Sequence, residues 1–427
     1  MRQNGAKVWS EIDGQKRLLE EPVAPYGADF LFDPDDVTLR AKGAPRELKA
    51  LPEDLMQPII KWAGGKSKEL KFIIPNAPGY TNFYEPFVGG GSVFAAVEGD
   101  HFYINDLSSE LIALYRNIST QNKEFFSLTD EIIASWDRAH RFYNTEKGVL
   151  RELYLTYREG ITNDVSTLKS QVALFCRERE EEIRTIPGPS MRNDSWILCR
   201  EIEDTLVRKF IRTKKIEADR HLLSYEDLDS TLETVIKGSL YMFYRALYND
   251  TVAVPVDSVL HCALFLFIRN YCYSGMFRYN DDGKFNVPYG GIAYNSKSLT
   301  KKIDYYLSLP LRNKFNRTSI YNLDFEDFLK TVKPGPDDFV FLDPPYDSEF
   351  SSYAGNDFTR ADQRRLADYL INECRAKWML IIKNTDFIRG LYDNKEGILI
   401  RSFDKEYLVS FMNRNDKKVT HLLITNF

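Results

Sequence analysis

Near the carboxyl end of the chain, a short apolar run leads directly into a carboxylate, two prolines and an aromatic ring. Phe339–Leu342 has the composition of a buried strand, and it is followed by Asp343, Pro344, Pro345 and Tyr346. The prolines hold φ at about −65° and donate no backbone hydrogen bond, so the carbonyl groups of Asp343 and Pro344 lie outside a strand ladder. In an open α/β sheet, ligands bind outside the carboxyl ends of the strands. A carboxylate, a free carbonyl and a stacking ring at such a place are suited to hold a planar exocyclic amine.

A glycine-rich segment is the second candidate for ligand binding. It follows a predicted strand at residues 82–84, and its candidate cofactor-binding residues are Glu85, Pro86, Phe87, Gly89 and Gly91. Three successive glycines allow a sharp turn and a close approach to a ligand. A flexible loop gives the same pattern, but the position between a strand and a helix favours a binding loop. Neither GxGxxG nor GxxxxGK[ST] occurs here, so the loop suits adenosine without a pyrophosphate.

Three further side chains complete the predicted cofactor site. Asp106 ends the predicted strand at residues 101–104, where an acidic side chain hydrogen-bonds ribose hydroxyls; capping the following helix is the alternative. Trp62 either stacks on a purine or packs in the core, and Lys66 meets either a carboxylate or solvent. Together these groups match an amino acid joined to adenosine, which describes S-adenosylmethionine.

The elements that must position these residues alternate between strand and helix from residue 58 onward. Further strands are predicted at 318–321, 339–342 and 378–382, with a closing hairpin at 406–412 and 420–427. Between about 120 and 260 the pattern is helical, with a break at Ile186–Pro189. We therefore predict an α/β fold: a catalytic domain at 57–120 and 300–427, and a helical insertion at 121–299. Residues 1–56, which are polar and rich in proline, are an N-terminal appendage of unknown role.

Composition restricts the class of protein further. The net charge of −5 does not by itself indicate a nucleic-acid partner. The segment Thr205–Lys215 carries only basic charges, which fits either DNA contact or a solvated helix face. Five cysteines without CxxC pairs indicate a reduced, cytoplasmic setting, and the lack of Cys/His clusters argues against a metal site. No apolar run approaches the length of a membrane span, so no membrane partner is expected.

Five motifs, taken in order, resemble the Dam-like (alpha-group) site-specific adenine-N6 DNA methyltransferases. These motifs are Lys61–Lys66, Tyr84–Gly91, Asn270–Gly290, Asp343–Tyr346 and Leu422–Phe427. The resemblance covers about 57–120 and 260–427. It implies a Rossmann-like sheet that uses S-adenosylmethionine, a helical target-recognition insertion, and a prokaryotic or phage source.

The resemblance also assigns roles to individual residues. It places Trp62, Lys66, Asp106 and Asp343 on S-adenosylmethionine, above the glycine loop, and it gives Asp343, Pro344, Pro345 and Tyr346 to a flipped adenine. A DNA-contacting hairpin is implied at Tyr273, Ser274, Met276, Arg278, Tyr279 and Asn280. Arg278 would contact bases or backbone, with a surface salt bridge as the alternative. Ser274 departs from the asparagine that is common in the family.

We therefore predict methyl transfer from S-adenosylmethionine to N6 of a flipped adenine in double-stranded DNA, with a cognate restriction endonuclease as a candidate partner. RNA adenine, a protein amide and cytosine N4 are alternative substrates, but those relatives more often carry Asn or Ser where Asp343 stands. A non-catalytic DNA-binding relative is the remaining alternative. The helical insertion contacts DNA, binds a partner or serves as structural filler, and we favour DNA contact.

Overall fold

The computed structural model describes residues 9–12, 15–18, 56–160, 164–346, 358–406 and 418–427. The chain divides into two compact units, Met1–Val37 and Thr38–Phe427. In the first unit, β1 (Trp9–Ile12) and β2 (Gln15–Leu18) pair antiparallel. Apart from these two strands, the predicted appendage at 1–56 lies almost wholly outside the described residues, and its role stays a prediction.

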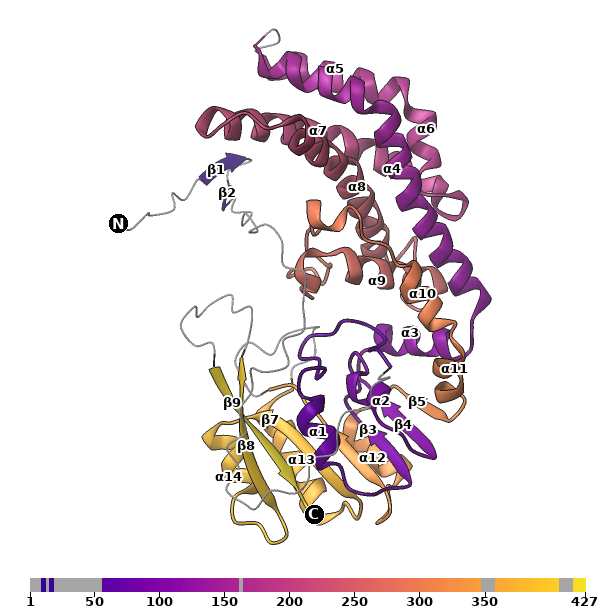
Figure 1. Cartoon of the computed structure of the whole chain (residues 1–427), viewed down its shortest axis with the longest axis vertical. Coiled ribbons are helices and arrows are strands. Elements are labelled where there is room, and N and C mark those ends of the chain that lie inside the picture. The colour runs from indigo at the N-terminus through magenta and orange to yellow at the C-terminus, as the bar shows by residue number, and fades with distance from the viewer. Residues whose placement is uncertain (1–8, 13–14, 19–55, 161–163, 347–357, 407–417) are drawn as a thin grey trace, which may run out of the picture. The chain divides into compact units, whose positions relative to one another are not determined.

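The second unit is built on a sheet of seven strands in the order β5-β4-β3-β6-β7-β9-β8. Most of these strands are labelled in Figure 1. The strands are β3 (Asn82–Glu85), β4 (His101–Asn105), β5 (Thr318–Tyr321), β6 (Phe339–Leu342), β7 (Lys377–Lys383), β8 (Leu399–Glu406) and β9 (Lys418–Thr425). β3 to β7 run parallel, and β9 is antiparallel to both β7 and β8. From β3 the chain builds outward through β4 to β5, and then in the opposite direction through β6 to β7. The strand order therefore reverses between β3 and β6, where open α/β sheets bind their ligands.

Apolar side chains cover both faces of the sheet, as expected for parallel strands. One face, which includes Val340 and Trp378, packs against α12 (Phe325–Val332), α13 (Arg360–Asn372) and α14 (Asp386–Tyr392). On the other face, Phe102 of β4 meets Phe94 of α2 with ring centroids 5.6 Å apart. The remaining helices of this part are α1 (Leu70–Asn76), α2 (Ser92–Ala96), α3 (Ser109–Ser119), α10 (Thr300–Tyr306) and α11 (Leu309–Phe315). Because helices cover both faces of the sheet, reactive groups are expected at the ends of the strands.

A group of long helices lies between β4 and β5 in the sequence. These are α4 (Lys123–Arg158), α5 (Val165–Glu178), α6 (Glu180–Thr185), α7 (Trp196–Asp219), α8 (Tyr225–Asn249) and α9 (Val259–Tyr271), with the 3₁₀ turns η1 (Pro189–Asp194), η2 (Tyr273–Gly275) and η3 (Ile292–Tyr294). Asn122, Ser224 and Ser258 cap α4, α8 and α9 with their side chains, which accept backbone N–H groups of the first turn. α8 packs against α4, α7 and α9, and α9 in turn packs against α3. α9 is therefore the helix through which this group meets the part of the chain that follows β4.

The strands predicted at 82–84, 101–104, 318–321, 339–342 and 378–382 are confirmed, as are the helical stretch and its break at Ile186–Pro189. Of the first strand of the closing hairpin, predicted at 406–412, only residue 406 is described, and the strand residues before it were not predicted. That strand, β8, spans Leu399–Glu406, and residues 407–412 lie outside the described part of the chain. The register explains this omission, because β8 begins at Leu399 to pair with Thr425 of β9. The alternating, partly charged sequence of this strand carries little hydrophobic signal.

Candidate active site

The first and fourth motifs meet at the carboxyl end of β6. Asp343 directly follows β6, and its carboxylate forms an ion pair with the ammonium of Lys66, 277 residues away in the sequence. The side chain of Lys66 is 3% exposed and that of Asp343 is 19% exposed. Lys66 also donates to the carbonyl of Gly64 at 2.9 Å. The carboxylate that Lys66 meets in the structure is therefore a protein group at the expected catalytic position.

Tyr346 is held in this site by two partners. Its hydroxyl lies 3.5 Å from Lys66 Nζ and 3.1 Å from His421 Nε2. His421 belongs to β9, is fully buried, and meets the Tyr346 ring edge-on at a centroid distance of 5.4 Å. The turn itself is fixed by the buried Gln363 of α13, whose amide donates to the Pro345 carbonyl at 2.8 Å. Lys66 and His421 thus orient the half-exposed Tyr346 side chain, and Gln363 holds the turn before it.

The triple-glycine loop is pressed against its own protein. A Cβ at Gly90 would lie 2.3 Å from the Ile60 carbonyl oxygen, and one at Gly91 would lie 2.4 Å from the Tyr115 hydroxyl. Gly91 also has a φ of +74°, a conformation that glycine adopts freely. Ile59 N–H donates to the Gly90 carbonyl at 2.9 Å. Glycine is needed here because the loop packs between the residue 59–62 segment and α3.

Two more carboxylates lie near this loop. Asp106 accepts hydrogen bonds from the backbone N–H groups of Gly89 at 3.0 Å and Ser108 at 2.9 Å. Glu85 is buried and accepts from Phe94 N–H at 2.9 Å, at the start of α2. Burial raises the pKa of Glu85 well above its usual value, although the Phe94 N–H opposes this, and the charges of Asp343 and Asp106 add to the rise. Burial also raises the pKa of Asp106, against the lowering effect of its backbone donors.

The other residues predicted near the cofactor have mixed surroundings. Pro86 is buried, and its carbonyl accepts from Asn105 at 3.0 Å. The Phe87 ring packs against Phe325 with centroids 5.6 Å apart. The half-buried Trp62 ring lies 5.3 Å from that of Phe277. The alternative role for Asp106 is wrong, because α3 begins at Ser109 with Ser108 as its cap.

The predicted hairpin follows α9. Its arms meet in two antiparallel bridges, Cys272 with Tyr289 and Tyr279 with Phe285. Arg278 is exposed, and its Nε donates to Asn286 Oδ1 on the opposite arm at 2.8 Å. No carboxylate lies within ion-pair distance of Arg278 among the described residues, which removes the surface salt bridge as the explanation for it there. A second nitrogen, Nη2, lies 3.5 Å from the Asn286 carbonyl, so the exposed guanidinium is anchored to the opposite arm.

The remaining hairpin candidates divide into outward-facing and structural residues. Ser274 is exposed and has a φ of +53°, in the left-handed region that asparagine tolerates better than serine. Asn280 accepts from Lys284 N–H at 2.8 Å and closes the hairpin turn. The Tyr279 hydroxyl turns inward to Glu110 of α3 at 3.2 Å and to Tyr248 of α8 at 3.1 Å. Tyr273 and Met276 are half-buried beside these residues.

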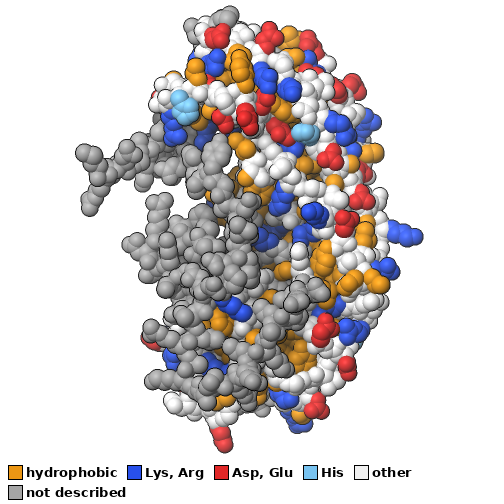
Figure 2. All heavy atoms as spheres, viewed as in Figure 1, with side chains coloured by type: hydrophobic (Ala, Val, Ile, Leu, Met, Phe, Trp, Pro, Cys, Tyr) orange, Lys and Arg blue, Asp and Glu red, His pale blue; other side chains and the backbone are white. Residues whose placement is uncertain are grey.

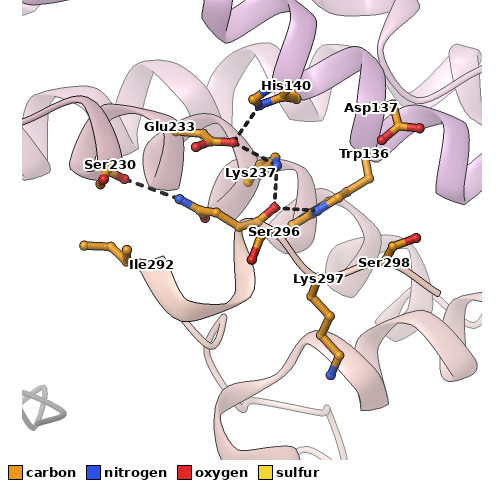
Figure 3. Close-up of a pocket in the computed structure, with 11 residues that line it drawn as sticks. Trp136, Asp137, His140, Ser230, Glu233, Lys237, Ile292, Ser296, Lys297 and Ser298 are labelled. Atoms are coloured by element: carbon orange, nitrogen blue, oxygen red, sulfur yellow. Dashed lines mark hydrogen bonds and ion pairs between the residues drawn. The ribbon is translucent and has the colours of Figure 1, made fainter. Parts of the chain in front are cut away.

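A cavity of about 410 Å³ lies apart from this site, between α4, α8 and the segment after η3, as Figure 3 shows. Lys237 donates to the Asn295 carbonyl at 2.5 Å and pairs with Glu233 at 2.8 Å. His140 also lies 2.8 Å from Glu233. Because these groups satisfy one another, they fix the segment that follows the hairpin onto the helices.

The basic segment Thr205–Lys215 belongs to α7. Lys214 donates to the Tyr157 carbonyl at 2.7 Å, and Arg208 donates to the Asp204 carbonyl at 3.2 Å. On the described part of the face in Figure 2, basic side chains are interspersed with acidic ones. DNA contact by this segment stays a prediction.

Comparison with known proteins identifies the family. A model of the D12 class N6 adenine-specific DNA methyltransferases matches residues 62–403. The chain belongs to this family. Type II methyltransferase M.CviBI of Paramecium bursaria Chlorella virus NC1A is 27% identical over 380 residues, which cover 87% of this chain and 100% of that protein. Type II methyltransferase M.MjaIII of Methanocaldococcus jannaschii is 26% identical, over 87% of this chain and 99% of that protein. The DNA N-6-adenine-methyltransferase of Escherichia phage P1 is 25% identical over 81% of this chain but only 32% of its own length.

This D12 methyltransferase is therefore an adenine-specific DNA methyltransferase, and the predicted family, fold class and activity are confirmed. The family implies DNA as the substrate and S-adenosylmethionine as the methyl donor. Within the described ranges, none of the helices has the length and apolar character needed to cross a membrane.

The site of this D12 methyltransferase fits the donor chemically. Glu85, Asp106 and Asp343 supply three carboxyl groups, and Lys66 supplies one buried cation. An acidic site with one lysine matches a ligand with a sulfonium, an ammonium and one carboxylate. Each of these carboxyl groups also has a partner within the protein: Phe94 N–H for Glu85, the Gly89 and Ser108 N–H groups for Asp106, and Lys66 for Asp343.

Sequence reasoning about the D12 methyltransferase missed His421, Gln363, Glu110 and Arg269. Gln363 and Glu110 look like ordinary polar helix residues in the sequence. The available signal was the isolated polar position of His421 within β9, directly before Leu422–Ile424, and of Arg269 near the end of the apolar helix α9.

Proposed function

We propose that this enzyme methylates adenine N6 at one short sequence of duplex DNA, on a base extruded into the site at the end of β6. The supporting observation is the meeting of Lys66, Asp343 and Tyr346 beside the switch point of the sheet. A base inside a duplex cannot reach a recessed site, so extrusion is required, at a cost of a few kcal/mol.

Asp343 and Pro344 would orient the target amine. The lone pair of this amine is delocalised into the ring, and hydrogen bonds from both amino protons to the carboxylate and the Pro344 carbonyl favour a pyramidal nitrogen. S-adenosylmethionine supplies an electrophilic methyl group, so catalysis is chiefly orientation and electrostatics. Lys66 compensates the charge of the mostly buried Asp343 carboxylate. The Tyr346 ring would stack on the extruded base, which contributes on the order of 1–3 kcal/mol.

The donor would be held by residues of the first two motifs. Asp106 would accept ribose hydroxyls, Trp62 would lie beside the purine, and Lys66 with Asp343 would face the amino acid end. Gly89 and Gly91 would support the donor from below, and Pro86 and Phe87 would shape the pocket wall. Glu85 would act indirectly, by holding the start of α2 through Phe94 N–H.

DNA would be contacted by the hairpin, through the exposed Arg278 and Ser274 with Tyr273 and Met276 behind them. Tyr279 and Asn280, which were predicted to bind DNA, would instead support the hairpin from within. We also propose that the long helices contact DNA and widen the footprint of the enzyme on it. Binding to duplexes of decreasing length would test this.

The experiment is methyl transfer from labelled S-adenosylmethionine to duplex DNA, with RNA of the same sequence in parallel. Asp343→Ala should abolish transfer while the protein remains folded. Substantial turnover by this variant would refute the role of Asp343. Sequencing DNA from expressing cells would then give the modified base and its context.

The similarity to two type II methyltransferases supports a role in restriction and modification, with a cognate endonuclease as partner and action on cytoplasmic DNA. DNA from expressing cells should resist an endonuclease encoded beside the gene. If that endonuclease cleaved the methylated DNA, the methyltransferase would have a role that does not involve it.

A further inference from the structure

Arg269, near the end of α9, lies buried between the loop of the first motif and the loop that opens the hairpin. Arg269 is only 2% exposed. One terminal nitrogen donates to the carbonyls of Met276 at 3.0 Å and Gly275 at 3.3 Å. The other donates to the Lys61 carbonyl at 3.1 Å. One guanidinium therefore joins two loops that are more than 200 residues apart, Lys61 being 208 residues from Arg269.

Aromatic rings line the same guanidinium. Its central carbon lies 4.3 Å from the Phe277 ring centroid and 5.1 Å from that of Trp62. The Trp62 and Phe277 rings are themselves 5.3 Å apart. Gly275 also faces the aliphatic part of Lys61, since a Cβ there would lie 3.2 Å from Lys61 Cδ. The two loops thus pack against each other with Arg269 at their junction.

Burying the guanidinium charge of Arg269 costs folding free energy. This cost is understandable if function requires the arrangement of the two loops that Arg269 joins. Burial lowers the pKa of Arg269, and Nε has no hydrogen-bond partner among the described residues. Within the described ranges its hydrogen-bond acceptors are backbone carbonyls, and no ion pair with a carboxylate is found there. An apolar side chain would fill the same space without an unpaired donor or a buried charge. Only a side chain with a rigid fork of donors can hold several carbonyls of two loops at once.

We propose that Arg269 is a positioning residue. It holds the DNA-contacting hairpin against the loop of the first motif, Lys61–Lys66. It acts through the Lys61 and Met276 carbonyls and touches neither the donor nor the reacting base. The proposal rests on the hairpin's proposed role in DNA binding. Loss of Arg269 should therefore weaken duplex binding even without S-adenosylmethionine, because the hairpin no longer has a fixed partner surface.

The test compares Arg269→Met and Arg269→Lys with a matched control, Arg138→Met. Arg138 of α4 is half-buried and also donates to backbone carbonyls, those of Ile186 at 2.8 Å and Glu131 at 3.4 Å, but it touches neither loop. Duplex affinity would be measured by fluorescence anisotropy without donor, and melting temperature by calorimetry. Arg269→Met should weaken DNA binding roughly tenfold, in the range of coupling between contacting residues, whereas Arg138→Met should leave it within about twofold. Arg269→Lys, which keeps the charge but reaches fewer carbonyls, should fall between.

A second comparison uses the exposed Arg278. Because Arg269 fixes the hairpin that carries Arg278, Arg278→Ala should weaken binding less in the Arg269→Lys protein than in the unaltered protein. Equal affinity for the Arg269 and Arg138 variants at equal loss of melting temperature would overturn the proposal, as would additive effects of Arg269 and Arg278. If the unaltered protein binds duplex DNA without transferring methyl groups, the proposed function fails, while the affinity comparison still decides the role of Arg269.

Discussion

Removal of the Lys66 ammonium, as Lys66→Met, should destabilise the enzyme because it removes the cation that pairs with the Asp343 carboxylate. Breaking a fully buried pair costs about 3–5 kcal/mol, and an exposed pair contributes about 0–1 kcal/mol. Lys66 is 3% exposed and Asp343 is 19% exposed, which places this pair nearer the buried limit. We expect a loss of about 2–3 kcal/mol for Lys66→Met.

Asp343→Asn should cost less, about 1–2 kcal/mol, since Lys66 keeps the Gly64 carbonyl as an acceptor at 2.9 Å. The double variant removes both charges together, so its loss should fall short of the sum by about 2 kcal/mol. For a chain of this length, 1 kcal/mol corresponds to roughly 1 °C in melting temperature. Calorimetry of the four proteins should show this coupling.

The matched control is Lys314, a lysine that is 1% exposed and donates to the Val97 carbonyl. It lies on the face of the sheet that packs against α2. Lys314→Met and Asp343→Asn should be additive in melting temperature. Methyl transfer gives a second readout, because Lys66→Met retains the Asp343 carboxylate and should keep some turnover, while Asp343→Asn should not. Additivity of Lys66→Met with Asp343→Asn would refute the inference that the two side chains stabilise each other.

Four other changes test separate parts of the structure. Arg278→Ala should relax sequence preference at one position by about 1–3 kcal/mol in competition assays, and a uniform loss across sequences would make it a phosphate contact. Tyr346→Ala should lower turnover more than donor affinity, whereas Tyr346→Phe, which keeps the ring, should change turnover little; equal losses in turnover and donor affinity for the alanine variant would contradict stacking. Gly91→Ala should lower the unfolding free energy by about 2 kcal/mol or more, because its Cβ would lie 2.4 Å from a tyrosine hydroxyl, while Gly148→Ala, with open space, should not destabilise. Burial lowers the pKa of His261 from 6.5 to about 4, so this residue binds more protons when unfolded; stability should fall by about 2 kcal/mol between pH 7.5 and 5, and His261→Gln should flatten that part of the profile.

Much of the catalytic sheet could be predicted because its strands carry local signals. Phe339–Leu342 is an unbroken apolar run that ends at two prolines, and its bounds were predicted without error. The charged strand β8 lacked such a run, and its residues before Glu406 were not predicted, because its limits depend on pairing with β9. Local sequence pattern predicts the bounds of a strand that is buried on both faces. It does not predict the bounds of a strand whose register is set by pairing with a partner strand.

The sequence by itself determined which chemical groups the site contains: the Asp343–Tyr346 segment, the glycine loop and the hairpin, each with a recognisable order of residue types. Only the tertiary structure decided which of these groups touch. It pairs Lys66 with Asp343, sets His421 against Tyr346, and places Arg269 between the first motif and the hairpin. Residue types are properties of the chain, but these contacts join positions up to 277 residues apart and exist only once the sheet and helices have packed.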